Sequence, residues 1–206
     1  MNNNIYRRKP ESFKYILFNK PYNVLCQFTK VDGKKTLADF GFPKNVYAVG
    51  RLDYDSEGLL LLTDDATVKY RIEDPKFRQH KTYLAQVENT PTEFDIEKLR
   101  RGVRIKNNST NTYFTTLPAH IELLGEAPKI FPRSVPIRFR KNVPTQWLKI
   151  MLREGKNRQV RKMTASIGFP TLRLIRIAIG KLSIESLQVG EWRELQELEV
   201  NDWFLP

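Results

Sequence analysis

The chain has 206 residues, the length of one domain or of one domain with a small appendage, and its 28% charged and 40% hydrophobic residues exclude an intrinsically disordered chain. Its longest run of leucines, 59–62, is far shorter than the ~20 apolar residues of a membrane-spanning helix, and the single Cys26 excludes an internal disulfide or a cysteine-rich zinc site. The net charge of +12 indicates an anionic partner, and because the N-terminus lacks the apolar segment of a secretory signal we expect a cytoplasmic protein.

Alternation and turn residues predict an α+β domain over 14–206, preceded by a basic flexible arm, 1–13. Strands are expected at 15–18, 24–28, 46–49, 58–63, 81–87, within 113–124, at 147–152, at 172–179 and near 192–195. A helix is expected at 66–72 and a short helix or turn at 36–40. A second helix is expected from a cap at Thr92 to Arg101, with an apolar stripe of Phe94, Ile96 and Leu99, and a third from a cap at Asn157 to Ile167. Many strands with few helices indicate a mostly antiparallel mixed sheet flanked by helices and loops.

Positive charge is concentrated in residues 129–181, which contain 14 basic residues and one acid, Glu154. Such a segment steers and holds phosphates, so nucleic acid is the favoured partner. A solvated basic face is the alternative. An anionic membrane is disfavoured, because no long helix combines a basic polar face with an aromatic apolar face.

Three alternating acids, Asp53, Asp55 and Glu57, lead into the leucine run. The spacing approaches a calcium loop, but the twelfth position holds Asp64 where a glutamate is needed. A magnesium-dependent nuclease built on Asp53 and Asp55 would need further acids, which the basic segment nearly lacks. The third interpretation is a structural turn in which these acids pair with arginine and lysine.

Two other motifs suit RNA. In the helix expected after Asn157, Val160 and Met163 face the core and Arg158, Arg161 and Lys162 lie opposite, near amide groups that attract phosphate. A solvated charged face is the alternative for this helix. In the strand Lys81-Thr82-Tyr83-Leu84, the tyrosine either packs in the sheet or stacks on an extruded base, an interaction that contributes ~1–3 kcal/mol.

Together these motifs resemble the RsuA-type family of ribosomal pseudouridine synthases. The resemblance is carried, in the family's order across about 15–195, by Asn19-Lys20-Pro21, Gly50-Arg51-Leu52-Asp53, Ser56-Glu57-Gly58-Leu59-Leu60, Lys81-x-Tyr83 and the stretch from Glu154 to Arg161. The stretches 26–29, 144–149 and 168–176 are similar to one branch of this family, the large-subunit synthase E branch, which lacks an N-terminal S4 RNA-binding domain.

The resemblance implies a synthase domain with an active-site cleft across the sheet, which isomerises a specific uridine of 23S rRNA to pseudouridine without cofactor or metal. Asp53 is implied as the essential catalytic residue, Tyr83 as the aromatic that stacks on the flipped base, and Arg158, or with less support Arg161, as the partner of Asp53. The carboxylate either attacks C1′ or deprotonates C2′, and attack on the uracil ring is the competing route. The expected RNA-binding residues are Lys20, Arg51, Arg133, Arg138, Arg140, Lys156, Lys162, Arg173 and Arg176.

The expected partner is 23S rRNA or a large-subunit assembly intermediate, bound by a monomer away from membranes. Asp55 and Glu57 then become turn or supporting residues, His80 and His120 receive no role, and Cys26 and the three tryptophans are expected to pack. Departures from the family pattern at Tyr22, 64–66 and Lys162 leave the target uridine open. A metal-dependent ribonuclease, a non-catalytic ribosome-assembly factor and a synthase for another rRNA site are the alternatives.

Overall fold

The computed structural model describes residues 13–73, 79–108, 110–137, 140–184, 187–196 and 199–200. Of the expected arm, only Phe13 lies within this part of the chain. Arg138 and Trp203 lie outside it. In the described part, no helix is long and apolar enough to cross a membrane.

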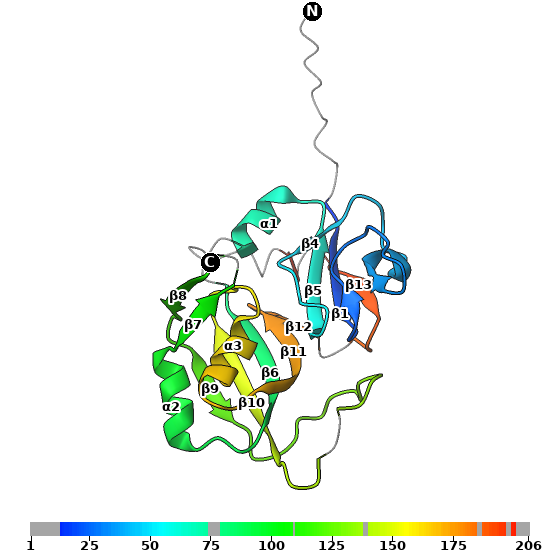
Figure 1. Ribbon diagram of the computed structural model, residues 1–206. Coiled ribbons are helices and arrows are strands. Elements are labelled where there is room, and N and C mark those ends of the chain that lie inside the picture. Colours follow the sequence, from blue (N-terminus) through cyan, green and yellow to red (C-terminus); the bar gives the residue numbers. More distant parts are fainter. Residues whose placement is uncertain are drawn as a thin grey trace, which may run out of the picture.

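Thirteen strands are described, and nine of them form one sheet. Their bounds are β1 (Tyr15–Lys20), β2 (Val24–Leu25), β3 (Lys35–Thr36), β4 (Tyr47–Val49), β5 (Glu57–Thr63), β6 (Lys81–Glu88), β7 (Arg104–Asn107), β8 (Thr112–Thr115), β9 (His120–Leu123), β10 (Thr145–Leu152), β11 (Thr171–Ile179), β12 (Leu182–Ser183) and β13 (Trp192–Glu194). The sheet has the order β13-β1-β5-β11-β6-β10-β9, with β4 beside β5 and β12 beside β11 (Figure 1). Its pairs are antiparallel except β5 with β11, which confirms the expected mostly antiparallel mixed sheet.

The helices are η1 (Leu37–Phe40), α1 (Ala66–Glu73), α2 (Glu93–Arg101) and α3 (Gln159–Ser166). The predicted cap of α2 is confirmed: Thr92 and Asp95 form a reciprocal capping box. The stripe of α2 is wrong at Phe94, which is 72% exposed while Ile96 and Leu99 are buried. Residues two apart on a helix point in nearly opposite directions, so Phe94 cannot share the face of Ile96.

Two other local predictions are wrong. The strand expected at 24–28 ends at Leu25, because the backbone turns there and the carbonyl of Gln27 accepts a hydrogen bond from the N–H of Leu37 instead of a strand partner. The predicted cap Asn157 lies one residue too early. The N-cap of α3 is Arg158, which has a left-handed backbone (φ 52°) and makes no side-chain cap.

The leucine strand β5 is buried on both faces of the sheet. Leu60 and Leu62 pack into one hydrophobic cluster, which also contains residues of α2, α3 and β6, and Leu59 and Leu61 pack into another with Val68 of α1. A strand covered on both sides needs an unbroken apolar run, which explains four leucines in succession. The expected packing roles of Trp147, Trp192 and the half-buried Cys26 are confirmed by their contacts with the hydrophobic clusters.

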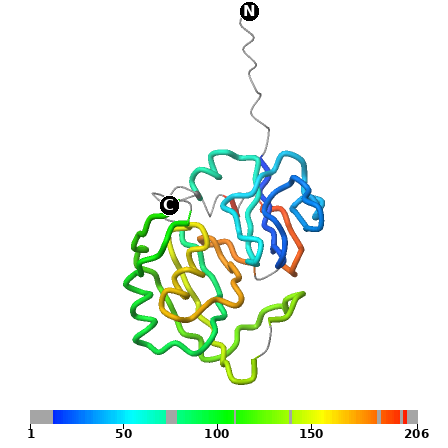
Figure 2. Tube along the Cα trace, in the orientation of Figure 1, coloured from blue at the N-terminus to red at the C-terminus, as the bar shows by residue number. Residues whose placement is uncertain are grey.

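The sheet joins two halves of the chain at β5 and β11. In Figure 2 the blue and cyan N-terminal segment lies on one side, the green and yellow segment on the other, and the orange β11 between them. The parallel pairing covers Glu57 opposite Ile175 and Gly58 opposite Arg176, a junction that we call the β5–β11 junction. Gly58 has φ 100°, and a Cβ atom there would lie 2.2 Å from the carbonyl oxygen of Arg176. The junction therefore requires a glycine.

Replacement of Gly58 by alanine is expected to cost about 3 kcal/mol or more of unfolding free energy, because it adds a clash with backbone to an unfavourable φ. Gly33→Ala is the matched control: Gly33 also has positive φ (68°) but has no atom within 4 Å of its Cβ position, so only about 1 kcal/mol is expected. Urea denaturation measures both. Equal losses in the two variants would contradict a specific requirement at the junction.

Candidate active site

A cavity of about 230 Å³ lies over β6, β10 and β11, where the loop 50–56 meets the loop 153–158. Its lining residues are Gly50, Arg51, Leu52, Asp53, Ser56, Lys81, Tyr83, Leu152, Gly155, Lys156, Asn157, Arg158, Gln159, Val160, Leu174 and Arg176. The cavity therefore gathers the Arg-Leu-Asp, Lys-x-Tyr and Glu-Gly-Lys-Asn-Arg motifs, which are far apart in the sequence. Tyr83 forms part of its inner wall and is 8% exposed.

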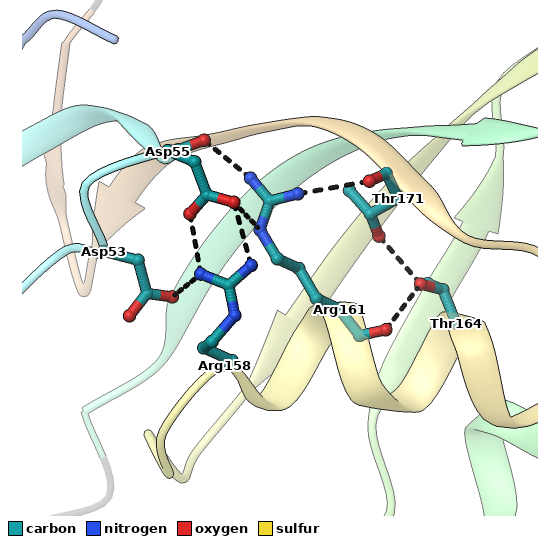
Figure 3. A network of polar contacts seen from close by, with 6 residues as sticks. All are labelled: Asp53, Asp55, Arg158, Arg161, Thr164 and Thr171. Atoms are coloured by element: carbon teal, nitrogen blue, oxygen red, sulfur yellow. Dashed lines mark hydrogen bonds and ion pairs between the residues drawn. The ribbon is translucent and has the colours of Figure 1, made fainter. Parts of the chain in front are cut away.

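Asp53 is the only carboxylate among these lining residues. It follows β4, and the N–H of Ser56 donates to the Asp53 carbonyl in the turn that leads into β5. Its side chain is 29% exposed, and its Oδ2 lies 3.7 Å from Nη1 of Arg158. The carboxylate thus lines the cavity and also lies beside one guanidinium, that of Arg158, as Figure 3 shows for the pair.

Arg158 binds Asp55 more closely than Asp53. Its Nη1 and Nη2 donate to the two carboxylate oxygens of Asp55 at 2.7 and 2.8 Å, in a bidentate geometry. The hydrogen bond to Asp55 is the main reason that the pKa of Arg158 is raised. Of the two predicted partners of Asp53, Arg158 is thus the one that approaches it, as a bridge between the two aspartates.

Arg161 of α3 also binds the loop 50–56, through Asp55. Its Nη2 donates to the backbone carbonyl of Asp55 at 2.6 Å and its Nη1 to that of Thr171 at 3.1 Å, while its Nε lies 3.4 Å from Asp55 Oδ2 (Figure 3). Burial raises the pKa of Asp55, but the hydrogen bond from Arg158 and the charges of Arg161 and Arg158 outweigh it, so that the pKa is lowered overall. Asp55 therefore fixes the loop of Asp53 to α3 and β11.

Glu57 and Arg173 form a buried ion pair on the opposite face of the sheet. Nε and Nη2 of Arg173 donate to the Glu57 carboxylate at 2.9 and 2.8 Å, and Nη2 also donates to the Phe131 carbonyl. The Arg173 and Glu57 side chains are 8% and 5% exposed. Among the residues that the structure describes, no group of three His, Cys, Asp or Glu side chains is arranged to hold a metal ion. The acids of the 53–57 segment instead pair with arginines, as the structural-turn interpretation expects.

Two of the expected RNA-binding residues are inside the protein. Lys20 is fully buried and donates to the carbonyls of Pro21 and Val24, and burial lowers its pKa to about 8. Arg173 is held by Glu57. Neither side chain has the surface exposure that a phosphate contact needs, so the structure does not support these two expectations. Arg176 is also buried and donates to the Leu59 carbonyl at 2.8 Å, but it lines the cavity.

Four of the remaining basic residues line this cavity or a second one. Arg51 and Lys156 are exposed at the first, and Lys162 is half-buried on α3. Arg133 and Arg140 line a cavity of about 380 Å³ beside the end of β6, where Arg133 lies 4.2 Å from the ring of Tyr22 and Arg140 pairs with Glu88. The expected residue Arg138 is outside the described part.

The sequence reasoning missed Lys81 as a residue of the site, although the signal was available. On a strand, residues two apart point to the same face, so the spacing Lys81-x-Tyr83 places both side chains in one cavity. Ser56 and Gln159 were missed as well, and no periodicity marks them.

Comparison with known proteins now decides the family. Residues 14–166 match the family model described as RNA pseudouridylate synthase. The chain belongs to this family. It is an RNA pseudouridine synthase, an enzyme that isomerises uridine to pseudouridine, as the motifs predicted.

Named relatives place this synthase among ribosomal enzymes. It is 52% identical over 183 residues to ribosomal large subunit pseudouridine synthase E of Vibrio parahaemolyticus, covering 89% of this chain and 74% of that one. The protein of the same name from Xanthomonas campestris is 51% identical, over 86% of this chain and 93% of its own. Ribosomal large subunit pseudouridine synthase B of Bacillus subtilis is 34% identical, over 90% of this chain and 69% of its own. The RsuA-type assignment is therefore confirmed.

Solved structures agree on the fold. A crystal structure of a pseudouridylate synthase superposes with a TM-score of 0.72 at 28% sequence identity, covering 92% of this chain and 73% of that one. The human RNA pseudouridylate synthase domain containing 1 superposes with a TM-score of 0.55 at 14% identity, over 91% of this synthase and 89% of its own chain, which supports the fold alone.

Replacement of Asp55 by asparagine is expected to lower the free energy of unfolding by about 1–2 kcal/mol at neutral pH, a loss between those typical of exposed and of buried ion pairs. A lowered folded-state pKa stabilises the protein above the ordinary aspartate pKa, and this contribution is lost as pH falls through the folded-state value. Urea denaturation from neutral to acidic pH should therefore show the difference between the wild type and Asp55→Asn shrinking as the pH falls. A difference that stays constant to about pH 3 would contradict the ion-pair role.

Proposed function

We propose that this synthase isomerises one uridine of 23S rRNA, in free rRNA or in a large-subunit assembly intermediate, with Asp53 as its essential catalytic residue. The relatives at about 50% identity named for the large ribosomal subunit support the choice of RNA. The observation that carries the catalytic assignment is that Asp53 is the only carboxylate lining a cavity otherwise rich in cations. We further infer that the enzyme acts as a monomer in the cytoplasm, because its sequence has no heptad repeat or long apolar stripe for self-association and because ribosomal RNA, the substrate class named for its relatives, is a cytoplasmic molecule.

The reaction sets the requirements for this cavity. It breaks the N1–C1′ bond, turns the uracil, and joins C5 to C1′, and since nothing is oxidised and no group is lost the chemistry requires no cofactor. A uridine inside a helix is out of reach of the cavity, so the nucleotide must be flipped out. The aromatic face of Tyr83 in the cavity wall suits stacking on that base.

Asp53 in this proposal acts on the sugar. Its carboxylate either attacks C1′ or removes the proton from C2′ as the glycosidic bond loosens. Arg158, 3.7 Å away, keeps the carboxylate pointed at the cavity, while its own position is fixed by Asp55. Arg158 is thus a positioning residue.

The exposed cations bind the rest of the RNA. Arg51 and Lys156 at the cavity rim are placed to meet the backbone of the flipped nucleotide. Arg133 and Arg140 at the second cavity, together with Lys162 on α3, extend the basic surface for neighbouring phosphates. Arg138, which lies outside the described residues, stays a predicted RNA contact from the sequence.

The catalytic assignment is tested with 23S rRNA transcribed with tritium at uracil C5, since formation of the C5–C1′ bond must release that hydrogen to water. In EDTA, the wild type should release tritium and Asp53→Asn should be at least ~10³-fold slower, as expected when a covalent or proton-transfer group is removed. Glu122→Gln, an exposed carboxylate on β9, is the control and should keep full activity. If free rRNA is inert, particles lacking the modification are used.

The outcomes separate the alternatives. An Asp53→Asn variant as active as the wild type would overturn the role of Asp53. Strand cleavage that EDTA abolishes would identify a metal-dependent ribonuclease acting on this RNA. Tight binding to particles without tritium release from either RNA would favour an assembly factor, and release from a 16S transcript alone would move the target to another rRNA.

The RNA-binding surface is tested by the salt dependence of binding. The double variant Arg133→Ala, Arg140→Ala is expected to bind the rRNA more weakly and to reduce the slope of log K against log salt by about one to two units, because each lost phosphate contact removes slightly less than one unit. The control Lys98→Ala, Arg101→Ala removes two charges from α2, which contributes no residue to either cavity, and should leave the slope unchanged. Equal slopes for all three proteins would place the RNA elsewhere.

A further inference from the structure

The cavity of Asp53 has an excess of positive charge that the RNA backbone does not explain. Its lining contains five cations, Arg51, Lys81, Lys156, Arg158 and Arg176, against one carboxylate. Arg51 and Lys156 are exposed at its rim, and Arg158 is engaged by the aspartates. Lys81 and Arg176 are buried in its inner part, at 9% and 2% exposure, where a phosphate of the RNA chain does not reach.

Lys81 differs from its buried neighbour Arg176, which donates to two backbone carbonyls. Arg176 donates through Nε to the Leu59 carbonyl. For Lys81, no ion pair or hydrogen bond to its ammonium occurs among the described residues, and Glu154, the nearby acid of the 153–158 loop, instead accepts from the Leu117 amide and the Gln159 side chain. Burial, and then the charge of Arg176, lower the pKa of Lys81. The Lys81 side chain is buried along its length, but its ammonium is open to the cavity, where a bound anion would supply the partner that the described residues do not.

The position of Lys81 indicates which anion its ammonium would bind. Lys81 and Tyr83 lie two residues apart on β6 and point to the same face, so the ammonium lies beside whatever stacks on the tyrosine. The Lys81 side chain runs along Gly155, where a Cβ atom would be only 3.7 Å from its Cε. The ammonium thus shares the cavity of Tyr83, in which the base of the proposed substrate would stack on the tyrosine ring.

We propose that Lys81 is a catalytic residue that binds a carbonyl oxygen of the uracil and stabilises the negative charge that the base acquires when the glycosidic bond breaks. This inference rests on the proposed function. When Asp53 attacks C1′ or removes the C2′ proton, the electron pair of the N1–C1′ bond leaves with the uracil, which becomes an anion delocalised over its ring nitrogens and carbonyl oxygens. The charge disappears when C5 bonds to C1′, a step that releases the Asp53 carboxylate from C1′ or returns the proton to C2′. The neutral ring then loses the C5 hydrogen as a proton and gains a proton at N1. An ammonium preorganised in a closed cavity stabilises such transient charge strongly.

The test compares Lys81→Met with Lys81→Arg in single-turnover conversion of uridine to pseudouridine, with RNA affinity measured separately. Lys81→Met should lower the single-turnover rate ~10²–10³-fold, as loss of a donor to a developing anion does, and change Kd less than about threefold. Lys81→Arg, which keeps the charge, should recover a large part of the rate. Lys149→Met on the neighbouring β10 is the matched control, because this exposed lysine lies outside the cavity.

A second substrate separates catalysis from a structural role. In 5-fluorouridine, the electron-withdrawing fluorine itself stabilises the uracil anion, so the rate loss in Lys81→Met should be at least about tenfold smaller with 5-fluorouridine at the target than with uridine. Nuclease digestion and chromatography with mass detection measure the conversion of the target nucleotide to its C-glycoside. The product from 5-fluorouridine keeps its fluorine on a saturated C5 and takes up water at C6, because it has no C5 hydrogen to lose. A variant that merely distorts the cavity loses the same factor with both substrates.

The outcomes are distinct. Equal rates of Lys81→Met and wild type, an equal loss with both substrates, or a change confined to Kd would each overturn the proposal for Lys81. An inactive wild type on both free rRNA and particles would instead overturn the proposed function. Thermal denaturation checks that the variants fold, and if Lys81→Met does not, Lys81→Gln, which keeps length and polarity without charge, is measured in the same way.

Discussion

The junction between β5 and β11 is the constraint on which the arrangement of the site depends. It joins the half of the sheet that carries the Asp53 loop to the half that carries Tyr83 and Lys81, through two residue pairs only. Gly58 lets the two backbones approach, Arg176 donates across to the carbonyl of Leu59, and Glu57 binds Arg173 from the other face. Because these contacts are buried, a shift at the junction would displace the carboxylate relative to the base that it must serve.

The arginines of β11 show why the basic segment misleads when it is read as a whole. Charge counting treats Arg173 and Arg176 as part of one RNA-binding surface, yet both are buried at the junction, where charged groups are stable only with partners. Arg173 forms an ion pair with Glu57, more than a hundred residues earlier in the chain. Arg176 donates a hydrogen bond to a backbone carbonyl and lines the cavity. The alternation along β11 decides which of the two faces each arginine meets.

Sequence reasoning succeeded where the signal is local or where several motifs occur together. The strands β1, β5, β6 and β10, the Thr92 cap and the burial of the leucine run follow from periodicity and turn chemistry, and the joint occurrence of the five motifs in order predicted the family. Sequence reasoning was less informative where tertiary contacts decide which groups a side chain binds. Lys20 lies in a motif, but its ammonium donates to two backbone carbonyls inside the protein. The start of α3 was misplaced because Arg158 adopts a left-handed backbone (φ 52°) that no propensity predicts and that the contact with Asp55 stabilises.

The division of labour between the two aspartates follows from how arginine binds carboxylates. A bidentate guanidinium occupies both oxygens of its partner, which leaves that partner rigid and unavailable. Asp55 accepts this role toward Arg158 and lies close to Arg161, so that Asp53, two residues earlier, keeps a single longer contact and an open face toward the cavity. In a loop with a single aspartate, the same carboxylate would have to bind the arginine that anchors the loop and also act on the substrate. With two, the anchor and the proposed catalytic group are held a fixed distance apart by the same short turn, and the positive charge that fixes the first also orients the second.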